Sequence, residues 1–344
     1  MKLNRAKAAT WSGCYDTQWG RLITKDACLH PAKFARGLIE RIYDYCLARG
    51  WLQAGDLVGD PFGGVGMGGL AAAYRKLRWL GLELEPRFVG IGADGWDCTG
   101  NEQLPVRSEG DGLPAWPVCQ GCAAAWKAGE VRPGHHAMGN LERHRGRLEA
   151  MGRPQPRLVL GDARAFAERT GLAAVVTSPP FEDREGAMTE LKLKSMPGPG
   201  RSHYSSPAAR AAQMERAEAE VYGQAPGQIG NERGATYWRA MARVYAQCHL
   251  ALRPGGLICV VVKDYVKHGE IVPLCATTAR LMEASGFVLV ERIRAMLVKE
   301  ERALNLDGTV ETTKTERKGF FRRLAEKKGA PAINWEEVII GKTL

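Results

Sequence analysis

Short β-like runs alternate with helical segments along most of the 344-residue chain. Helical patterns cover residues 31–50 and 235–252, and the second of these ends close to an Arg-Pro-Gly-Gly stop. This alternation predicts a mostly parallel α/β sheet with helices on both faces. We therefore expect a single domain over residues 1–344, with strands at 56–60, 78–84, 157–162, 172–178, 256–264, 287–297 and 335–342.

Three segments interrupt this alternation, at residues 92–156, 182–235 and 299–334. The first is rich in Gly, Trp and Pro, the second is long and irregular, and the third is dense in charges of both signs. Long loops inside a compact domain are usually functional or disordered. We interpret the three as insertions: a candidate zinc-binding segment, an active-site or target loop, and a basic hairpin or helix that faces DNA.

The charge and the cysteines restrict the class of protein. A formal net charge of +10 fits a polyanionic partner, and it also fits an ordinary soluble surface. No window approaches the ~18 consecutive apolar residues of a membrane span, and the N-terminal residues lack the apolar stretch of a secretory signal. Nine scattered cysteines predict free thiols in a reducing cytoplasm. The oligomeric state stays open.

A glycine-rich loop lies between a predicted strand and a predicted helix. Asp60 ends the strand, and Gly63, Gly64 and Gly66 let the backbone approach a ligand closely. Glu83 ends the next strand, where an acid that binds ribose stands in nucleotide-binding folds. The alternatives are a simple tight turn and a solvated carboxylate at the end of a strand.

Two consecutive prolines follow the hydrophobic strand at residues 172–178. Neither proline has an N–H group and each fixes φ, so the chain cannot continue there as a helix or a central strand. The stretch Thr177–Phe181 is therefore a rigid corner with few donors. On its own it fits a corner without a ligand as well as a binding site.

Taken together, these segments resemble the motif set of the amino-directed DNA methyltransferases, which use S-adenosylmethionine to methylate N4 of cytosine or N6 of adenine. The resemblance rests on Asp60–Gly66, Gly81–Glu83 and Thr177–Phe181, and it extends to His30–Phe34 with the helix after it. It covers nearly the whole chain outside the three insertions. It implies a Rossmann-like class I methyltransferase fold with the cofactor pocket at the strand C-termini, and with the cofactor motifs before the Ser-Pro-Pro-Phe motif.

The resemblance also implies roles for individual residues. Ser178 and Pro179 would accept hydrogen bonds from the exocyclic amine, whose delocalised lone pair makes it a poor nucleophile, and the prolines would hold these acceptors in place. Phe181 would stack on a base extruded from the duplex. The expected catalytic residues are Ser178, Pro179, Pro180 and Phe181, and the expected cofactor-binding residues are His30, Asp60, Pro61, Phe62, Gly63, Gly64, Gly66, Glu83, Asp162 and Thr177.

Ser in the first position of the motif favours cytosine N4 as the target, and adenine N6 is the first alternative. RNA base methylation and a catalytically inactive DNA-binding module are more distant alternatives. Cys119 and Cys122 have metal-knuckle spacing, and Cys98 and His135 would complete a tetrahedral zinc site. The alternative is two thiols without a metal.

Overall fold

A computed structural model describes the chain at residues 9–24, 27, 30, 34–93, 103–106, 116–119, 139–168, 171–182, 226–267, 269–304, 310–316, 326, 329 and 331–344. Eight strands of these ranges form the main sheet: β1 (Ala9–Trp11), β2 (Leu57–Asp60), β3 (Arg78–Glu83), β6 (Arg157–Leu160), β7 (Leu172–Thr177), β8 (Leu252–Val262), β11 (Val288–Met296) and β14 (Trp335–Lys342). Seven of them lie where the sequence pattern predicts strands.

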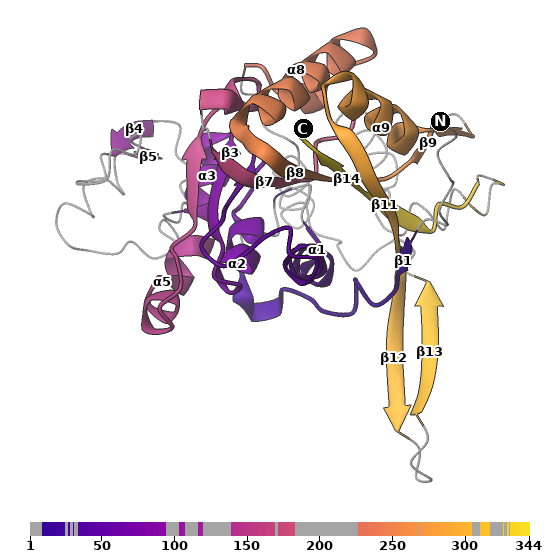
Figure 1. Cartoon of the computed structure of the whole chain (residues 1–344). Coiled ribbons are helices and arrows are strands. Elements are labelled where there is room, and N and C mark those ends of the chain that lie inside the picture. The colour runs from indigo at the N-terminus through magenta and orange to yellow at the C-terminus, as the bar shows by residue number, and fades with distance from the viewer. Residues whose placement is uncertain are drawn as a thin grey trace, which may run out of the picture.

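The strand order is β1-β11-β14-β8-β7-β2-β3-β6. β6, β3, β2, β7 and β8 pair in parallel, whereas β14 runs antiparallel to both of its neighbours, β8 and β11. The chain winds from β2 outward to β6, returns to β7, and then winds the other way (Figure 1). This mostly parallel α/β sheet confirms the predicted Rossmann-like fold.

Helices cover both faces of the sheet. The helical elements are η1 (Gly20–Leu22), α1 (Arg36–Ala48), α2 (Met67–Ala73), α3 (Pro86–Gly92), α5 (Asn140–Ala150), η3 (Ala163–Glu168), η4 (Ile229–Asn231), α8 (Ala235–Ala251) and α9 (Leu274–Ala284). α1, α2 and α3 contribute to one buried apolar cluster, and α8 and α9 contribute to the other. In the described part of the chain, no helix has both the length and the hydrophobicity that crossing a membrane requires.

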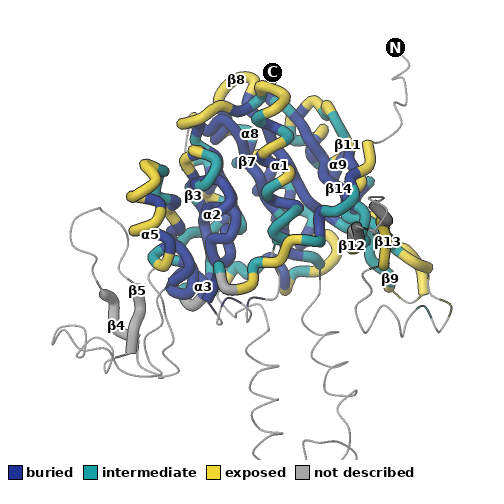
Figure 2. Tube along the Cα trace, turned by 90° about the horizontal axis from the view of Figure 1, so that it is seen from below, coloured by how far each residue is buried: buried dark blue, intermediate teal, exposed yellow. Residues whose placement is uncertain are grey.

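The strands between these two layers are buried on both faces. In β8, Leu257, Cys259 and Val261 face the α1–α2 layer, and the alternating residues between and after them face the α8–α9 layer. Successive side chains of a strand point to opposite faces, so a strand covered on both sides needs a continuous apolar run. Figure 2 shows this central part as the buried core of the molecule.

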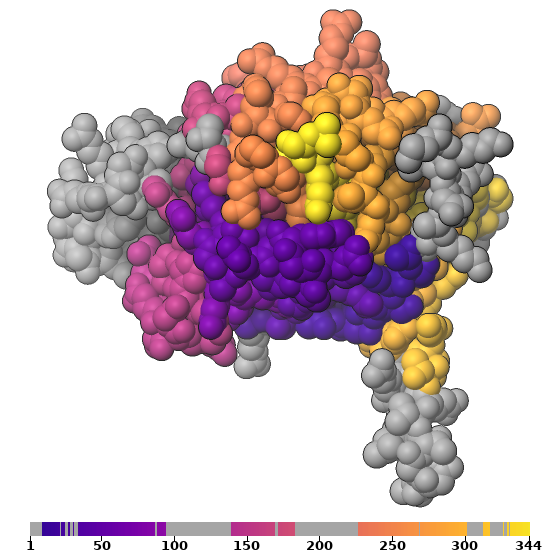
Figure 3. Space-filling model, viewed as in Figure 1, coloured from indigo at the N-terminus to yellow at the C-terminus, as the bar shows by residue number. Residues whose placement is uncertain are grey.

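The end of the sheet farthest from β6 joins distant parts of the sequence. β1 pairs in parallel with β11, which places the first described residues beside the C-terminal third of the chain (Figure 3). Among the described residues, three two-stranded hairpins lie outside the main sheet: β4 (Gln103–Val106) with β5 (Trp116–Cys119), β9 (Tyr265–Lys267) with β10 (Glu270–Val272), and β12 (Val298–Leu304) with β13 (Val310–Glu316). The β12–β13 hairpin follows β11 and projects from the body of the molecule (Figure 1).

Segments predicted as insertions contain ordered parts that touch the domain body. α5 belongs to the segment 92–156 and contacts α2 and α3. η4 belongs to the segment 182–235 and contacts α8. In the segment 299–334, the backbone N–H of Glu300 in β12 donates to Asp16 Oδ1 at 2.8 Å.

Candidate functional site

The glycine loop (residues 61–66) follows β2 and leads into α2. The Gly63 N–H donates to the Leu82 carbonyl at 2.6 Å, so the loop packs closely on the end of β3. A Cβ atom at Gly63 would lie 2.6 Å from Leu158 Cδ1, and Gly64 and Gly66 have φ of +56° and +78°. Side chains at these positions would clash or strain the backbone, and this explains the glycines.

Glu83 ends β3 and is buried against this loop. Its two carboxylate oxygens accept hydrogen bonds from the backbone N–H groups of Gly64, at 3.1 Å, and Glu85, at 3.0 Å. Burial raises the pKa of Glu83 to about 8, although these N–H donors oppose the shift. Glu83 is thus a carboxyl group that the backbone N–H groups of Gly64 and Glu85 hold in place at the end of β3.

Asp60 lies behind the glycine loop and joins it to the Pro-Pro corner (residues 177–181). Its Oδ1 accepts the Thr177 hydroxyl at 2.7 Å and the Phe62 N–H at 3.0 Å. Burial raises the pKa of Asp60 to about 7 against these two donors. β2 and β7 are the neighbouring strands at which the winding of the sheet reverses, and ligands bind at such a switch point. The hydrogen bond between Thr177 and Asp60 therefore fixes the glycine-loop motif and the Pro-Pro motif to each other at the switch point.

The Pro-Pro corner is held from three sides. The Ser178 hydroxyl donates to the Val261 carbonyl of β8 at 3.2 Å, and the Tyr237 hydroxyl of α8 donates to the Pro180 carbonyl at 2.9 Å. Directly after the corner, Glu182 accepts the Gly234 N–H at 2.6 Å. Two neighbouring elements, β8 and α8 with its N-cap residue Gly234, therefore fix the corner, which leaves little freedom at Ser178.

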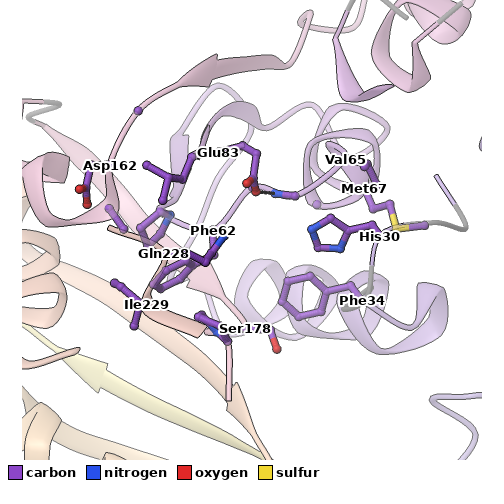
Figure 4. Close-up of a pocket in the computed structure, with 18 of the residues that line it drawn as sticks. His30, Phe34, Phe62, Val65, Met67, Glu83, Asp162, Ser178, Gln228 and Ile229 are labelled. Atoms are coloured by element: carbon purple, nitrogen blue, oxygen red, sulfur yellow. Dashed lines mark hydrogen bonds between the residues drawn. The ribbon is translucent and has the colours of Figure 1, made fainter. Parts of the chain in front are cut away.

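A pocket joins the glycine loop, Glu83 and this corner (Figure 4). Nine of the predicted site residues line it: His30, Pro61, Phe62, Gly63, Gly64, Glu83, Asp162, Ser178 and Pro180. Among the other predicted residues, Asp60 and Thr177 bind each other behind the loop, and Phe181 packs edge-to-face on Tyr265 with ring centroids 6.4 Å apart. Gly66 caps α2, and Pro179 is buried between two lining residues.

The pocket also contains residues that the sequence analysis did not single out. Phe34, Val65, Met67, Gly68, Leu84, Gly161, Ala163, Gly227, Gln228 and Ile229 line it as well. Most of them adjoin a predicted motif. Gln228 and its two neighbours do not, because they belong to the irregular segment 182–235, and no local pattern marks them as part of a site.

Asp162 follows β6 and lies at the end of the pocket away from His30 (Figure 4). Burial raises its pKa, but hydrogen bonds and charge from Arg164 outweigh burial and hold the pKa below its usual value. Arg164 Nη2 lies 2.6 Å from Asp162 Oδ2. Asp162 is therefore an ionised acceptor, whereas Glu83 is a carboxyl group whose charge burial disfavours.

The N-terminal segment that carries His30 is tied to the glycine loop through α5. Asn140, fully buried, accepts the Thr24 N–H at 2.7 Å and donates to the Val65 carbonyl at 2.8 Å. His30 packs edge-to-face on Phe88 with ring centroids 4.4 Å apart, and its ring lies 3.3 Å from the position of a Cβ atom at Gly64. The placement of His30 over the loop thus depends on long-range contacts.

The predicted zinc ligands lie almost entirely outside the described residues. Cys98, Cys122 and His135 are not among them, and Cys119 is described only as the last backbone position of β5. Within the described ranges, no cluster of three or more His, Cys, Asp or Glu side chains could hold a metal ion. The zinc site stays a prediction.

The pocket residues fit the cofactor that the motif resemblance implies. The glycine loop lines the pocket with backbone alone: a Cβ atom at Gly64 would lie 3.3 Å from the His30 ring, and one at Gly63 would meet Leu158 in the core, so neither position has room for a side chain. Glu83 and Asp162 supply carboxylate acceptors suited to ribose hydroxyls and a base amine. Leu84, Ala163 and Ile229 add apolar contacts from three different segments. An adenosine group with an attached chain matches this set of donors, acceptors and apolar surfaces.

Comparison with known proteins gives similar solved structures but no family. No protein-family model matches the sequence, and no curated protein matches it. TrmN from Thermus thermophilus is 13% identical with a TM-score of 0.38, over 93% of this chain and 52% of that chain, so the chain spans about half the length of TrmN.

Two further solved structures are similar to the chain. Precorrin-6y C5,15-methyltransferase from Geobacter metallireducens is 9% identical with a TM-score of 0.37, over 88% of each chain. An SAM-dependent methyltransferase from Methanosarcina mazei is 9% identical with a TM-score of 0.34, over 87% of this chain and 97% of that chain. With TM-scores below 0.4 and identities of 13% or less, these similarities assign no family, activity or substrate to the chain.

Proposed function

We propose that the chain transfers a methyl group from S-adenosylmethionine to an exocyclic amine of a base in DNA, with cytosine N4 as the target. The observation that carries this proposal is the shared pocket. Ser178 and Pro180 of the corner line the same pocket as the glycine loop, Glu83 and Asp162. The glycine loop with its two carboxyl groups and the Ser178 hydroxyl therefore face one space.

In this proposal the two carboxylates and the glycine loop bind the cofactor. Glu83 accepts the ribose hydroxyls, Asp162 accepts the adenine amine, and the loop leaves room for the methionine chain. When bound, S-adenosylmethionine supplies an electrophilic methyl group on its sulfonium. Because ribose hydroxyls would bind the ionised form of Glu83, cofactor binding lowers its pKa and is favoured as the pH rises toward about 8.

Ser178 is suited to accept a hydrogen bond from an amine. Its hydroxyl proton is used on the Val261 carbonyl, so only its oxygen lone pairs can act on a group in the pocket. An amine N–H that donates to this oxygen is oriented with its lone pair away from Ser178. The corner is held by Tyr237 and Glu182, so this alignment needs little reorganisation.

The choice of base rests on the resemblance. Ser at the head of the motif favours cytosine, with adenine N6 as the alternative target, and a net charge of +10 supports a polyanionic substrate. Phe181 packs on Tyr265 and is not among the pocket residues, so base stacking by Phe181 needs a change of its side-chain position.

The test is transfer from labelled S-adenosylmethionine to plasmid DNA, followed by digestion to nucleosides and mass spectrometry. We expect N4-methylcytosine. N6-methyladenine would overturn the choice of base and keep the reaction class, and label found only in an RNA substrate would overturn DNA as the substrate. The absence of transfer to DNA or RNA at low and moderate salt would refute the methyltransferase proposal.

A further inference from the structure

One side of the pocket is built by residues 226–232, just before α8. Gly227, Gln228 and Ile229 of this segment line the pocket. Figure 4 shows Gln228 and Ile229 on the side of Asp162, with His30 and Phe34 on the opposite side. Gln228 lies 143 positions after Glu85, so only the tertiary fold brings this segment to the cofactor motifs.

Two polar ties hold the segment in place. Gln228 Nε2 donates to Glu85 Oε1 at 3.0 Å, and Glu85 is the second residue after Glu83. Near the other end of the segment, Glu232 Oε1 lies 3.5 Å from Arg164 Nη1, and the same guanidinium pairs with Asp162. The segment is therefore anchored beside both carboxylates that line the pocket.

Gly227 brings the backbone of the segment against the Asp162–Arg164 pair. A Cβ atom at Gly227 would overlap Arg164 Nη2 and would lie 3.5 Å from Asp162 Oδ2, and the residue has φ of +92°. A side chain here would both displace the guanidinium and strain the backbone. Gly227 is thus required by the close approach of this segment to the Asp162–Arg164 pair.

The side chains of the segment suit the flat base of a nucleoside. Gln228 uses its amide nitrogen on Glu85, which directs its amide oxygen to act as an acceptor for a ligand N–H. Ile229 is 3% exposed and lines the pocket together with Leu84, the residue between Glu83 and Glu85. Apolar side chains with a fixed acceptor beside them match an aromatic ring that carries an amine.

We propose that residues 226–232 form the wall that holds the adenosine half of the cofactor, with Gln228 as a binding residue and Glu85 as the positioning residue that fixes Gln228. This inference rests on the proposed function, because it takes the ligand to be S-adenosylmethionine. It adds that the end of the segment 182–235 is part of the cofactor site.

The test measures the binding of two ligands by titration calorimetry: S-adenosylhomocysteine and 5′-methylthioadenosine, which lacks the amino-acid group. Gln228→Ala should weaken both by the same factor of about tenfold, because the lost contact concerns only the shared adenosine half. Glu85→Ala should have a similar effect, the double variant should be no weaker than either single variant, and Glu85→Gln, which keeps an acceptor oxygen, should restore most of the affinity.

Gln155→Ala is the matched control. Gln155 donates to the Arg145 carbonyl at 3.2 Å in an exposed position outside the pocket, so its loss should leave both affinities unchanged. Thermal melting of each variant identifies loss of folding. If Gln228→Ala does not fold, Gln228→Glu, which keeps the length of the side chain but sets a second carboxylate against Glu85, should show the same loss of affinity.

The outcomes separate this inference from the proposed function. Unchanged affinity in the folded Gln228 variant would overturn the inference and leave the proposed function in place. Additive losses for Gln228→Ala and Glu85→Ala would refute the positioning role of Glu85. If the wild-type chain binds neither ligand, both proposals fail, whereas binding without transfer to nucleic acid would sink only the proposed function.

Discussion

Glu83→Gln should change how the stability of the protein depends on pH. Burial raises the pKa of Glu83 from 4.5 to about 8 in the folded chain. A carboxyl group with a raised folded pKa contributes stability that is fully present below its unfolded pKa and is lost as the pH rises through the folded pKa. From about pH 5 to about pH 7 the unfolded chain gives up this proton and the folded chain keeps it, which lowers the free energy of unfolding by about 2 kcal/mol.

The amide side chain of the Glu83→Gln variant cannot ionise, so the free energy of unfolding of the variant does not fall in this way as the pH rises. The substitution has its own cost of about 1 kcal/mol, because the amide nitrogen faces one of the two backbone N–H donors that the carboxylate accepts from. We therefore expect variant and wild type to be similar in stability near about pH 5, and the variant to be more stable by about 2 kcal/mol near about pH 7. The buried Asp60 titrates in both proteins and cancels in the difference.

Urea unfolding over a series of pH values measures this difference from the transition midpoints, provided that the m values agree. Glu142→Gln is the matched control, because Glu142 forms an exposed ion pair with Arg145 at 2.6 Å and its carboxylate stays in contact with water. The curve of the control should follow that of the wild type. Parallel wild-type and Glu83→Gln curves over the whole range would refute the burial argument.

Three further substitutions test the site. Thr177→Val removes the 2.7 Å donor to Asp60, so urea unfolding at neutral pH should show a loss of about 1 kcal/mol, and an unchanged midpoint would contradict the role of this bond. Ser178→Ala should reduce methyl transfer at least about a hundredfold and leave the affinity for S-adenosylhomocysteine unchanged. Ser285→Ala, outside the pocket, is the control and should change neither. Equal loss of transfer and affinity would mean that Ser178 serves the cofactor. Gly66→Ala should lower the free energy of unfolding by about 1 to 2 kcal/mol because Gly66 has φ of +78°, and full stability would argue against that backbone conformation.

Local patterns in the sequence predicted the elements of the fold well. The apolar runs of β7 and β8 are strong signals because a strand covered on both faces is apolar at nearly every central position. The glycine loop and the Pro-Pro corner could also be predicted from the sequence, because glycines and consecutive prolines each restrict the backbone conformation within a few residues. Six of the nine predicted site residues that line the pocket belong to these two motifs: Pro61, Phe62, Gly63, Gly64, Ser178 and Pro180.

The same patterns did not mark Gln228, Phe34 or the position of Phe181. Gln228 reaches the pocket through its bond to Glu85, and an irregular stretch gives no periodic signal of such a contact. Phe34 lies in the segment before α1. The resemblance placed this segment near the cofactor but did not predict that the Phe34 side chain lines the pocket. Phe181 belongs to a readable motif, but its packing on Tyr265 depends on β9, which is distant in the chain.

The sequence by itself determined which segments become strands, which turn needs glycine and where the chain must form a rigid corner, because these are properties of local backbone conformation and hydrophobic periodicity. Only the tertiary structure decided what those segments meet. The Thr177–Asp60 hydrogen bond joins residues 117 positions apart, and Asn140 connects the N-terminal segment to the glycine loop. Gln228 lines the pocket although it belongs to no sequence motif. Contacts of this kind depend on the order of strands in the sheet. That order is set by the packing of the whole domain, so no short stretch of sequence predicts these contacts.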